Sequence, residues 1–487
     1  MADSNLSAGQ ADELARRAHE AERVWAGATR ADVDRVTEAM ARAGAAAAER
    51  LAALACEETG YGRVDHKTFK NLFCTEFLLE GIRNVPTVDV IAEYPERRFI
   101  EIAEPVGVIA GLIPVTNPTS TVLFKSLCAV KGRNAIVCAP HPRAVRCCAE
   151  SVRVLQEAAE RAGAPRDLVQ CMTEVTIEGT DALMRHYRTD LVLATGSRQM
   201  VLAAYSSGKP TYAVGPGNVP VYVHASVPDP GEAAAQIVVS RAFDYGTACT
   251  SEQAVVADAT IAARLRLELE SRGAYFCDAR EQAAVERLCF PRGDEELPST
   301  DIVGQAATRL ASMAGIGVPS GTRTLVVAPR GVGREHPLSH ELLCPILKWY
   351  EARSEDEALA TCEAVLRFGG DGHTAVLHAG DEAIVARYSR VPAYRILVNN
   401  PALFGAAGYS SGLDPTFMIG TGTIGGAISS DNIGPRHLIN IKRVALPIGS
   451  WRTSGIGENG AASTPVGADS DLEALVRQVV ERVTAAA

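Results

Sequence analysis

Strand and helix signals alternate along most of this chain, and this alternation limits the folds that it can adopt. Short β-type runs begin near Arg98, where Arg-Phe-Ile-Glu-Ile is soon followed by Val-Gly-Val-Ile-Ala-Gly-Leu-Ile. Expected strands and expected helices then take turns, at 134–138, 144–161, 191–194, 197–206 and 219–223. Alternation at this spacing favours βαβ units with a parallel sheet. The sequence therefore predicts an α/β fold.

Helical patterns precede this region, and a polar stretch follows it. Residues 8–60 repeat apolar residues at helical spacing, and Gly60 and Gly62 end the run. A second α/β region extends from about 239 to 425. A polar stretch at 454–468 then separates the body of the protein from a short C-terminal helix.

Composition excludes several classes of protein. A chain of 487 residues is long enough for two or three domains, and its net charge of −10 argues against nucleic acid or an anionic membrane as the main partner. It has no apolar run long enough to span a membrane, and its first residues lack the hydrophobic core of a secretory signal. The 12 cysteines form no metal-binding array, so we expect no metal site and a reducing cytoplasm.

Cys249 is the strongest candidate for chemistry. It lies in Phe243-Asp-Tyr-Gly-Thr-Ala-Cys-Thr-Ser-Glu-Gln253, a small polar turn between two apolar runs. A substrate can reach a thiol in such a turn, and backbone N–H groups can approach it, as covalent thioester catalysis requires. The common alternative for a single cysteine is a buried structural role.

Two turns that follow expected strands are candidate ligand sites. The turn Thr195-Gly196-Ser197 ends a strand and begins a helix, so its backbone N–H groups could hold a pyrophosphate. The chain lacks G-x-G-x-x-G, and an ordinary βα turn is the alternative. Asn117 lies in Ile113-Pro-Val-Thr-Asn-Pro, where an asparagine before proline also commonly serves a turn.

Together these segments resemble the aldehyde dehydrogenase superfamily over about residues 30 to 445. The resemblance implies an aldehyde dehydrogenase fold, with a Rossmann-like cofactor domain, an α/β catalytic domain and a small β oligomerisation arm. In the family, the cysteine of this loop is the nucleophile. Asn117 and the backbone N–H of Cys249 would then form an oxyanion hole.

The segment Val214-Gly-Pro-Gly-Asn-Val-Pro220 points to the CoA-acylating branch of this superfamily. Hydrolytic members carry E-L-G-G-K here, and Val214 takes the place of the glutamate that activates water. Valine cannot act as a base, so a thioester at Cys249 would wait for coenzyme A. The segments 369–374 and 434–440 also resemble this branch, and their His373 and His437 are candidate acids or bases, although each could be structural.

The resemblance also implies a nicotinamide cofactor. The segment 339–345 resembles E-x-F-G-P, whose glutamate binds the nicotinamide ribose, with Leu343 and Cys344 in place of phenylalanine and glycine. The choice between NAD and NADP stays open, because residues 139–143 replace the usual K-P-S/A-E pattern and Arg143 could bind a 2′-phosphate. The expected cofactor-binding residues are Thr195, Gly196, Ser197, Pro140, His141, Arg143, Gly215, Gly217 and Glu341.

These patterns predict a division of the chain into domains. The expected cofactor domain is 1–238, with an arm strand at about 94–107, and the expected catalytic domain is 239–425. The segment 426–453 would return to the cofactor domain and supply the second arm strand, at about 437–448. Because the family's arm pairs with another subunit, we expect a homodimer or homotetramer.

The C-terminal segment 469–487 carries a single apolar stripe and follows the expected linker at 454–468. Such tails resemble the peptides that target enzymes to the protein shell of bacterial microcompartments, although the helix could instead dock on its own domain. The predicted function is a reversible, CoA-acylating oxidation of an unidentified small aldehyde by NAD or NADP. A hydrolytic aldehyde dehydrogenase and a non-catalytic scaffold that binds shell proteins are the alternatives.

Overall fold

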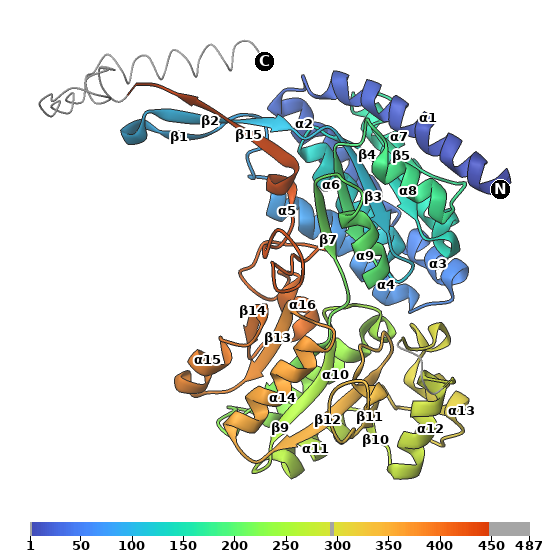
Figure 1. The fold of residues 1–487 in the computed structure, drawn as a ribbon, viewed down its shortest axis with the longest axis vertical. Helices are drawn as coiled ribbons and strands as arrows, with labels where there is room; N and C mark the ends of the chain where they lie inside the picture. Colours follow the sequence, from blue (N-terminus) through green and yellow to red (C-terminus); the bar gives the residue numbers. More distant parts are fainter. Residues whose placement is uncertain (1, 293–296, 448–487) are drawn as a thin grey trace, which may run out of the picture.

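The computed structural model describes residues 2–292 and 297–447. Two α/β units lie one above the other along the long axis of the molecule, and an extended arm leaves the first unit (Figure 1). No helix within the described residues is both long and apolar enough to cross a membrane.

The chain begins with the predicted helices, which pack around the first sheet. Gly60 ends the third of them in the left-handed conformation, with a φ of 72°, as the glycine pattern predicted. A π-helical turn at 73–77 joins the fourth helix to the fifth. The helices are α1 (Ala2–Trp25), α2 (Arg30–Ala46), α3 (Ala48–Thr59), α4 (Val64–Leu72) and α5 (Leu78–Ile82).

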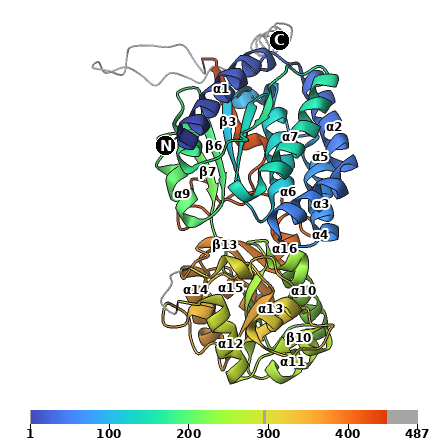
Figure 2. The same ribbon diagram turned by 90° about the vertical axis from the view of Figure 1, so that its right-hand side faces the viewer.

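The first sheet is a five-stranded parallel sheet in the order β5-β4-β3-β6-β7. Every residue of β3 and β4 is buried, which explains their continuous apolar runs. Figure 2 shows α1 and α9 on one side of this sheet and α6 and α7 on the other. The elements are β3 (Val108–Ile113), α6 (Pro118–Lys131), β4 (Ala135–Pro140), α7 (Val145–Arg161), β5 (Val169–Cys171), α8 (Ile177–Arg185), β6 (Leu191–Thr195), α9 (Arg198–Tyr205) and β7 (Thr211–Val214).

The second sheet has seven parallel strands in the order β10-β11-β12-β9-β8-β13-β14. Its strands are β8 (Val219–Val223), β9 (Glu252–Asp258), β10 (Ala274–Phe276), β11 (Thr324–Val327), β12 (Ile346–Ala352), β13 (Gly372–His378) and β14 (Ala393–Val398). The helices around it are α10 (Pro230–Ala242), α11 (Ala262–Ser271), α12 (Ala279–Cys289), α13 (Ala307–Ala314), α14 (Glu355–Arg367), α15 (Glu382–Tyr388) and α16 (Ala402–Ala406).

The boundary between the units differs from the one that the sequence predicts. Strand β8 pairs with β9 and β13, so it belongs to the second sheet. The chain therefore passes from one sheet to the other between Val214 and Val219, and the predicted boundary at 238/239 falls inside α10. All five residues of β8 are buried, as are those of the first sheet's central strands, so its sequence alone does not reveal which sheet it joins.

The arm is a three-stranded antiparallel sheet in the order β1-β2-β15. Strands β2 (Phe99–Pro105) and β15 (Ile439–Ala445) lie within the two segments predicted for it, and β1 (Asp89–Tyr94) adds a strand that was not predicted. The end of the predicted return segment, the linker at 454–468 and the helix at 469–487 lie outside the described residues.

Candidate active site

Most of the predicted site residues lie at one edge of the first sheet. Parallel strands end on the same side, so the turns after β3, β4, β6 and β7 are neighbours, and such edges commonly bind ligands. The backbone N–H of His141 donates to Ile113 O (3.0 Å), and that of Gly196 donates to Val214 O (3.4 Å). Asn117 and the turns at 140–143, 195–197 and 214–217 are therefore parts of one edge.

Cys249 lies in the loop between α10 and β9 and is half-buried. The loop begins with a sharp kink, because Asp244 and Tyr245 both have positive φ angles, of 49° and 52°. Burial, followed by the nearby Glu341 carboxylate, raises the pKa of Cys249 to about 12, although the backbone N–H groups of Cys249 and Thr250 favour the thiolate. The resting thiol is therefore protonated, and attack on a carbonyl requires that its proton be removed.

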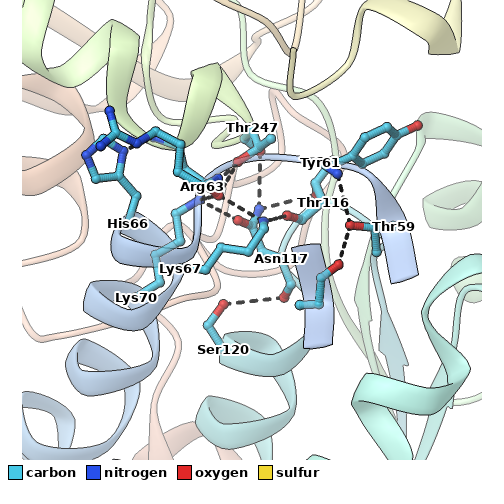
Figure 3. Close-up of polar contacts among 12 residues, drawn as sticks. Thr59, Tyr61, Arg63, His66, Lys67, Lys70, Thr116, Asn117, Ser120 and Thr247 are labelled. Carbon is cyan, nitrogen blue, oxygen red and sulfur yellow. Dashed lines mark hydrogen bonds and ion pairs between the residues drawn. The ribbon is translucent and has the colours of Figure 1, made fainter. Parts of the chain in front are cut away.

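Asn117 reaches the cysteine loop from the N-terminus of α6, across 130 positions of sequence. Its Nδ2 donates to Thr247 O and to Thr116 Oγ1, both at 3.2 Å (Figure 3). Its Oδ1 accepts a 2.6 Å hydrogen bond from Lys70 Nζ. The two residues predicted to act on the aldehyde thus belong to segments that contact each other.

A buried charge cluster lies beneath this contact, and no sequence pattern pointed to it. Lys67 Nζ and Lys70 Nζ donate to Asp244 Oδ2 at 2.9 and 2.6 Å, and all three side chains are at most 4% exposed. Burial would raise the pKa of Asp244, but Lys67 and Lys70 outweigh it and hold that pKa at about 2. The available sequence signal was two lysines at i and i+3, which share one face of α4.

Glu341 and Gly217 are in direct contact. The backbone N–H of Gly217 donates to Glu341 Oε1 at 2.8 Å, and burial raises the pKa of that carboxyl to about 7. A Cβ atom at Gly217 would lie 2.4 Å from Cys249 O and 3.0 Å from the ring of His373. Only glycine fits at this position, because here the turn after β7 packs directly against the cysteine loop.

His373 and His437 have different surroundings. His373 is fully buried at the start of β13, and burial lowers its pKa to about 3. Its Nδ1 lies 3.1 Å from Thr374 Oγ1, and its Nε2 has no hydrogen-bond partner in the part of the chain that the structure describes. His437 instead lies 3.0 Å from Asp431 Oδ2, with its ring against Tyr212. Cys249 O and the His373 ring both lie beside Gly217, so His373 is the histidine that lies at the cysteine loop.

Comparison with known proteins agrees with this arrangement. The model of the aldehyde dehydrogenase family matches residues 3–274, more than half of the chain. The chain belongs to the aldehyde dehydrogenase family. The family and the fold predicted from the sequence are confirmed.

Three similar proteins show how much of the chain the similarity covers. The bifunctional aldehyde-alcohol dehydrogenase AdhE of Escherichia coli is 38% identical over 451 residues, which cover 91% of this chain and 50% of that protein. The chain thus spans about half the length of this relative. An acetylating aldehyde dehydrogenase from Geobacillus thermoglucosidasius has a TM-score of 0.90 and 45% identity, and the match covers 92% of this chain and 99% of that one. A propionaldehyde dehydrogenase from the Clostridium phytofermentans fucose utilisation bacterial microcompartment has a TM-score of 0.81 and 27% identity, covering 89% and 96%.

The turn at 195–197 fits the nicotinamide cofactor that aldehyde dehydrogenases use. Thr195 Oγ1 is buried and has no hydrogen-bond partner among the described residues, so a ligand could satisfy it. Ser197 is exposed and caps α9, with its side chain accepting from Met200 N at 3.3 Å. A helix N-terminus beside an unpaired hydroxyl suits a phosphate-bearing ligand.

In the expected adenosine site, Arg143 already has partners within the protein. Pro140 is buried, whereas His141 is exposed and its Nδ1 accepts from Arg143 N at 3.1 Å. The Arg143 guanidinium donates to Tyr61 Oη (2.9 Å) and to Thr59 O (2.8 Å) and lies 4.8 Å from the centre of the Tyr61 ring. A 2′-phosphate would have to share this guanidinium with Thr59 at the end of α3 and with Tyr61 after it.

Val214, which the sequence resemblance aligns with the glutamate of hydrolytic aldehyde dehydrogenases, is the last residue of β7. It is 3% exposed and pairs with Thr195 of β6. The next residue, Gly215, begins the turn that leads to Gly217 and β8. The side chain at the aligned position is therefore both apolar and buried.

Proposed function

We propose that this chain is a CoA-acylating aldehyde dehydrogenase. It interconverts an aldehyde, CoA and NAD(P)+ with acyl-CoA and NAD(P)H through a thioester on Cys249. The observation that carries the proposal has two parts. Asn117 contacts the cysteine loop, and Val214 supplies no side chain that could activate water at the position aligned with the hydrolytic glutamate. The acetylating and aldehyde-alcohol dehydrogenases to which the chain is similar support it.

Cys249 is the proposed nucleophile. When its thiolate adds to the aldehyde carbonyl, negative charge develops on the oxygen. Asn117 Nδ2 and the backbone N–H of Cys249 are the proposed donors to that charge. A bound nicotinamide supplies the hydride acceptor, and the turn at 195–197 with Glu341 is the proposed holder of that cofactor. Cys249 Sγ then carries the acyl group.

The second transfer moves the acyl group to CoA. The CoA thiolate adds to the thioester carbonyl, the bond from that carbonyl to Cys249 Sγ breaks, and the sulfur leaves as a thiolate. We assign to His373 the orientation of the CoA thiol, as the acceptor of a hydrogen bond from its S–H group. Its pKa of about 3 keeps the imidazole neutral near pH 7, so its buried Nε2, which has no partner among the described residues, can accept this hydrogen bond.

The products test this proposal. The enzyme is incubated with an aldehyde and NAD+ or NADP+, with and without CoA, and acyl-CoA and free acid are both quantified. We expect acyl-CoA to dominate and sustained turnover to require CoA. Sustained release of free acid without CoA would instead support the hydrolytic alternative. A panel of aldehydes and acyl-CoAs with both nicotinamides identifies the substrate and the cofactor.

We propose that the arm joins subunits into a homodimer or homotetramer. Tyr94 and Ile441, on its outer strands β1 and β15, are 36% and 41% exposed, so apolar surface is available for a second copy. Light scattering of the full chain measures the oligomeric state, and Ile441→Lys should lower it. An unchanged mass for that variant, or a monomeric parent, would contradict the proposal.

We propose that residues 469–487 bind a microcompartment shell protein through their apolar stripe. The sequence pattern and the similarity to a microcompartment propionaldehyde dehydrogenase support this. Residues 454–487 fused to a fluorescent protein should be recruited to compartments, and glutamate at both Val476 and Val480 should block recruitment. If deletion of 454–487 unfolds the enzyme or separates its subunits, the segment docks on the enzyme itself.

A further inference from the structure

Lys70 makes a set of contacts that the proposed mechanism does not use. Its ammonium donates to Asp244 Oδ2 (2.6 Å), Asn117 Oδ1 (2.6 Å) and Thr247 Oγ1 (3.0 Å). The side chain is 4% exposed, and Figure 3 shows it pointing from α4 towards Asn117. An ammonium group has three hydrogens and no acceptor, so all three hydrogens are in use.

These contacts determine which way the Asn117 amide points. Because an ammonium can only donate, the atom of Asn117 that faces Lys70 must be the oxygen. The amide nitrogen is therefore held on the other side, where its two 3.2 Å hydrogen bonds go to Thr116 Oγ1 and Thr247 O. A developing oxyanion is a stronger acceptor than either group and can take over one of these hydrogens.

The same cluster places positive charge behind Asn117. Lys67 and Lys70 share one carboxylate, that of Asp244, so the three side chains together carry a formal charge of +1. Asp244 is held firmly, since Arg63 N donates to its Oδ1 at 2.8 Å and Thr247 Oγ1 donates to its Oδ2 at 2.7 Å. The carboxylate in turn holds the Lys70 ammonium in place against Asn117 Oδ1.

We propose that Lys70 is a positioning residue, which orients the Asn117 amide so that Nδ2 faces the substrate oxygen. The inference rests on the proposed role of Asn117 as an oxyanion donor. Lys70 acts through that amide and does not touch the substrate. Its effect should therefore appear in the chemical step rather than in binding of the aldehyde.

A double-mutant cycle on the full-length enzyme tests this inference. Asn117→Ala should lower kcat roughly 10²- to 10³-fold, the usual loss for one oxyanion donor. Lys70→Met should lower kcat about 10- to 100-fold and leave the KM for the aldehyde within about threefold. Because both act through one amide, adding Lys70→Met to Asn117→Ala should cost less than about threefold more.

Lys67→Met is the matched control. Lys67 is equally buried and also pairs with Asp244, but its other hydrogen bond goes to Thr116 O at 2.8 Å and not to Asn117. Its replacement should lower kcat less than Lys70→Met does, and its effect should multiply with that of Asn117→Ala. Thermal unfolding of each variant shows that folding is retained. Lys70→Gln, which keeps a donor, is the second variant if Lys70→Met does not fold, and it should show the same non-additivity.

Three results would overturn the inference. The effects of Lys70 and Asn117 replacement could multiply, the Lys70 variants could change only KM, or Lys67→Met could match Lys70→Met in both size and non-additivity. Asn117→Ala with an unchanged kcat would contradict the proposed role of Asn117 and, with it, this inference. A large loss for Asn117→Ala with fully additive Lys70 effects would contradict the inference alone.

Discussion

Gly217 and Glu341, 124 positions apart, are joined by a 2.8 Å hydrogen bond from the glycine N–H to the glutamate Oε1. The resemblance to the family assigns Glu341 to the nicotinamide ribose. In this structure the glutamate also acts on the proposed nucleophile, because its charge is one of the causes that raise the pKa of Cys249. Since burial raises the pKa of Glu341 itself to about 7, its carboxyl gains or loses a proton within the pH range in which enzymes usually work.

Glu341→Gln should therefore make the Cys249 thiol more reactive. The change removes a neighbouring negative charge but keeps an acceptor for Gly217 N, so the pKa of Cys249 should fall. At pH 8 we expect iodoacetamide to alkylate Cys249 about three to ten times faster than in the parent enzyme. Below pH 6 the two rates should converge, because Glu341 is then protonated. Mass spectrometry of the Cys249 peptide separates this thiol from the other cysteines.

Glu252→Gln is the matched control for this experiment, because Glu252 is another buried glutamate with a raised pKa and is not among the groups that act on Cys249. It should leave the alkylation rate close to that of the parent. Equal rates at pH 8 for the parent and Glu341→Gln would show that the glutamate charge does not control the thiol.

Glu252→Gln also tests how stability depends on pH. Burial raises the pKa of Glu252 to about 7, while the unfolded chain releases the same proton near pH 4.5. Between these values the folded state binds more protons, so the free energy of unfolding should fall as pH rises, by up to about 3 kcal/mol in total. The variant should lose this part of the pH dependence. Urea unfolding at pH 5 and pH 7.5 measures it, and parallel curves for parent and variant would refute the assignment.

Val214→Glu should shift the products towards free acid. The change places a carboxylate at the position that the resemblance aligns with the base of hydrolytic members, and general-base catalysis is worth about 10²- to 10⁴-fold when well aligned. In an unadapted site we expect the share of free acid to rise about tenfold. Val214→Gln controls for disturbed packing at this buried position, because glutamine has the size of glutamate but cannot act as a base. An equal rise in both variants would mean that altered packing, not a base, admits water.

His373→Asn should slow the transfer to CoA more than it slows formation of the acyl-enzyme. Rapid-mixing experiments should then show a burst of NAD(P)H, followed by slow turnover. Since the pKa of His373 is about 3, its imidazole stays neutral above about pH 4, so no loss of activity near pH 6.5 should depend on it. His437→Asn, whose ring is held by Asp431, should show no burst. A burst in neither variant would exclude His373 from the CoA step.

The sequence predicted the parts of this site that lie within short segments. The cysteine loop, the Asn117 turn and the turn at 195–197 each combine a recognisable motif with the end or start of a helix or strand, so local patterns were enough to single them out as candidates. Lys67, Lys70 and Asp244 form no such pattern, because the carboxylate is 174 positions beyond Lys70. Their cluster exists only once α4 packs against the cysteine loop.

Strand β8 illustrates the same limit for the fold. The run Val219–Val223 was predicted correctly as a strand but placed in the wrong unit. Its two neighbours in the sheet, β9 and β13, come later in the chain, and β13 begins at Gly372. A strand's own residues show that it is buried, whereas its partners follow from the packing of distant segments.

In the proposed mechanism, Cys249 carries the acyl group between CoA and the nicotinamide reaction. This role is tested most directly by mixing the enzyme with acetyl-CoA or propionyl-CoA in the absence of any nicotinamide. Intact-protein and peptide mass spectrometry should show one acyl group per chain on Cys249, with an equal amount of free CoA released. The Cys249→Ala variant should remain folded and unlabelled. Acylation at another cysteine, or an enzyme that turns over while Cys249 stays unmodified, would contradict the account.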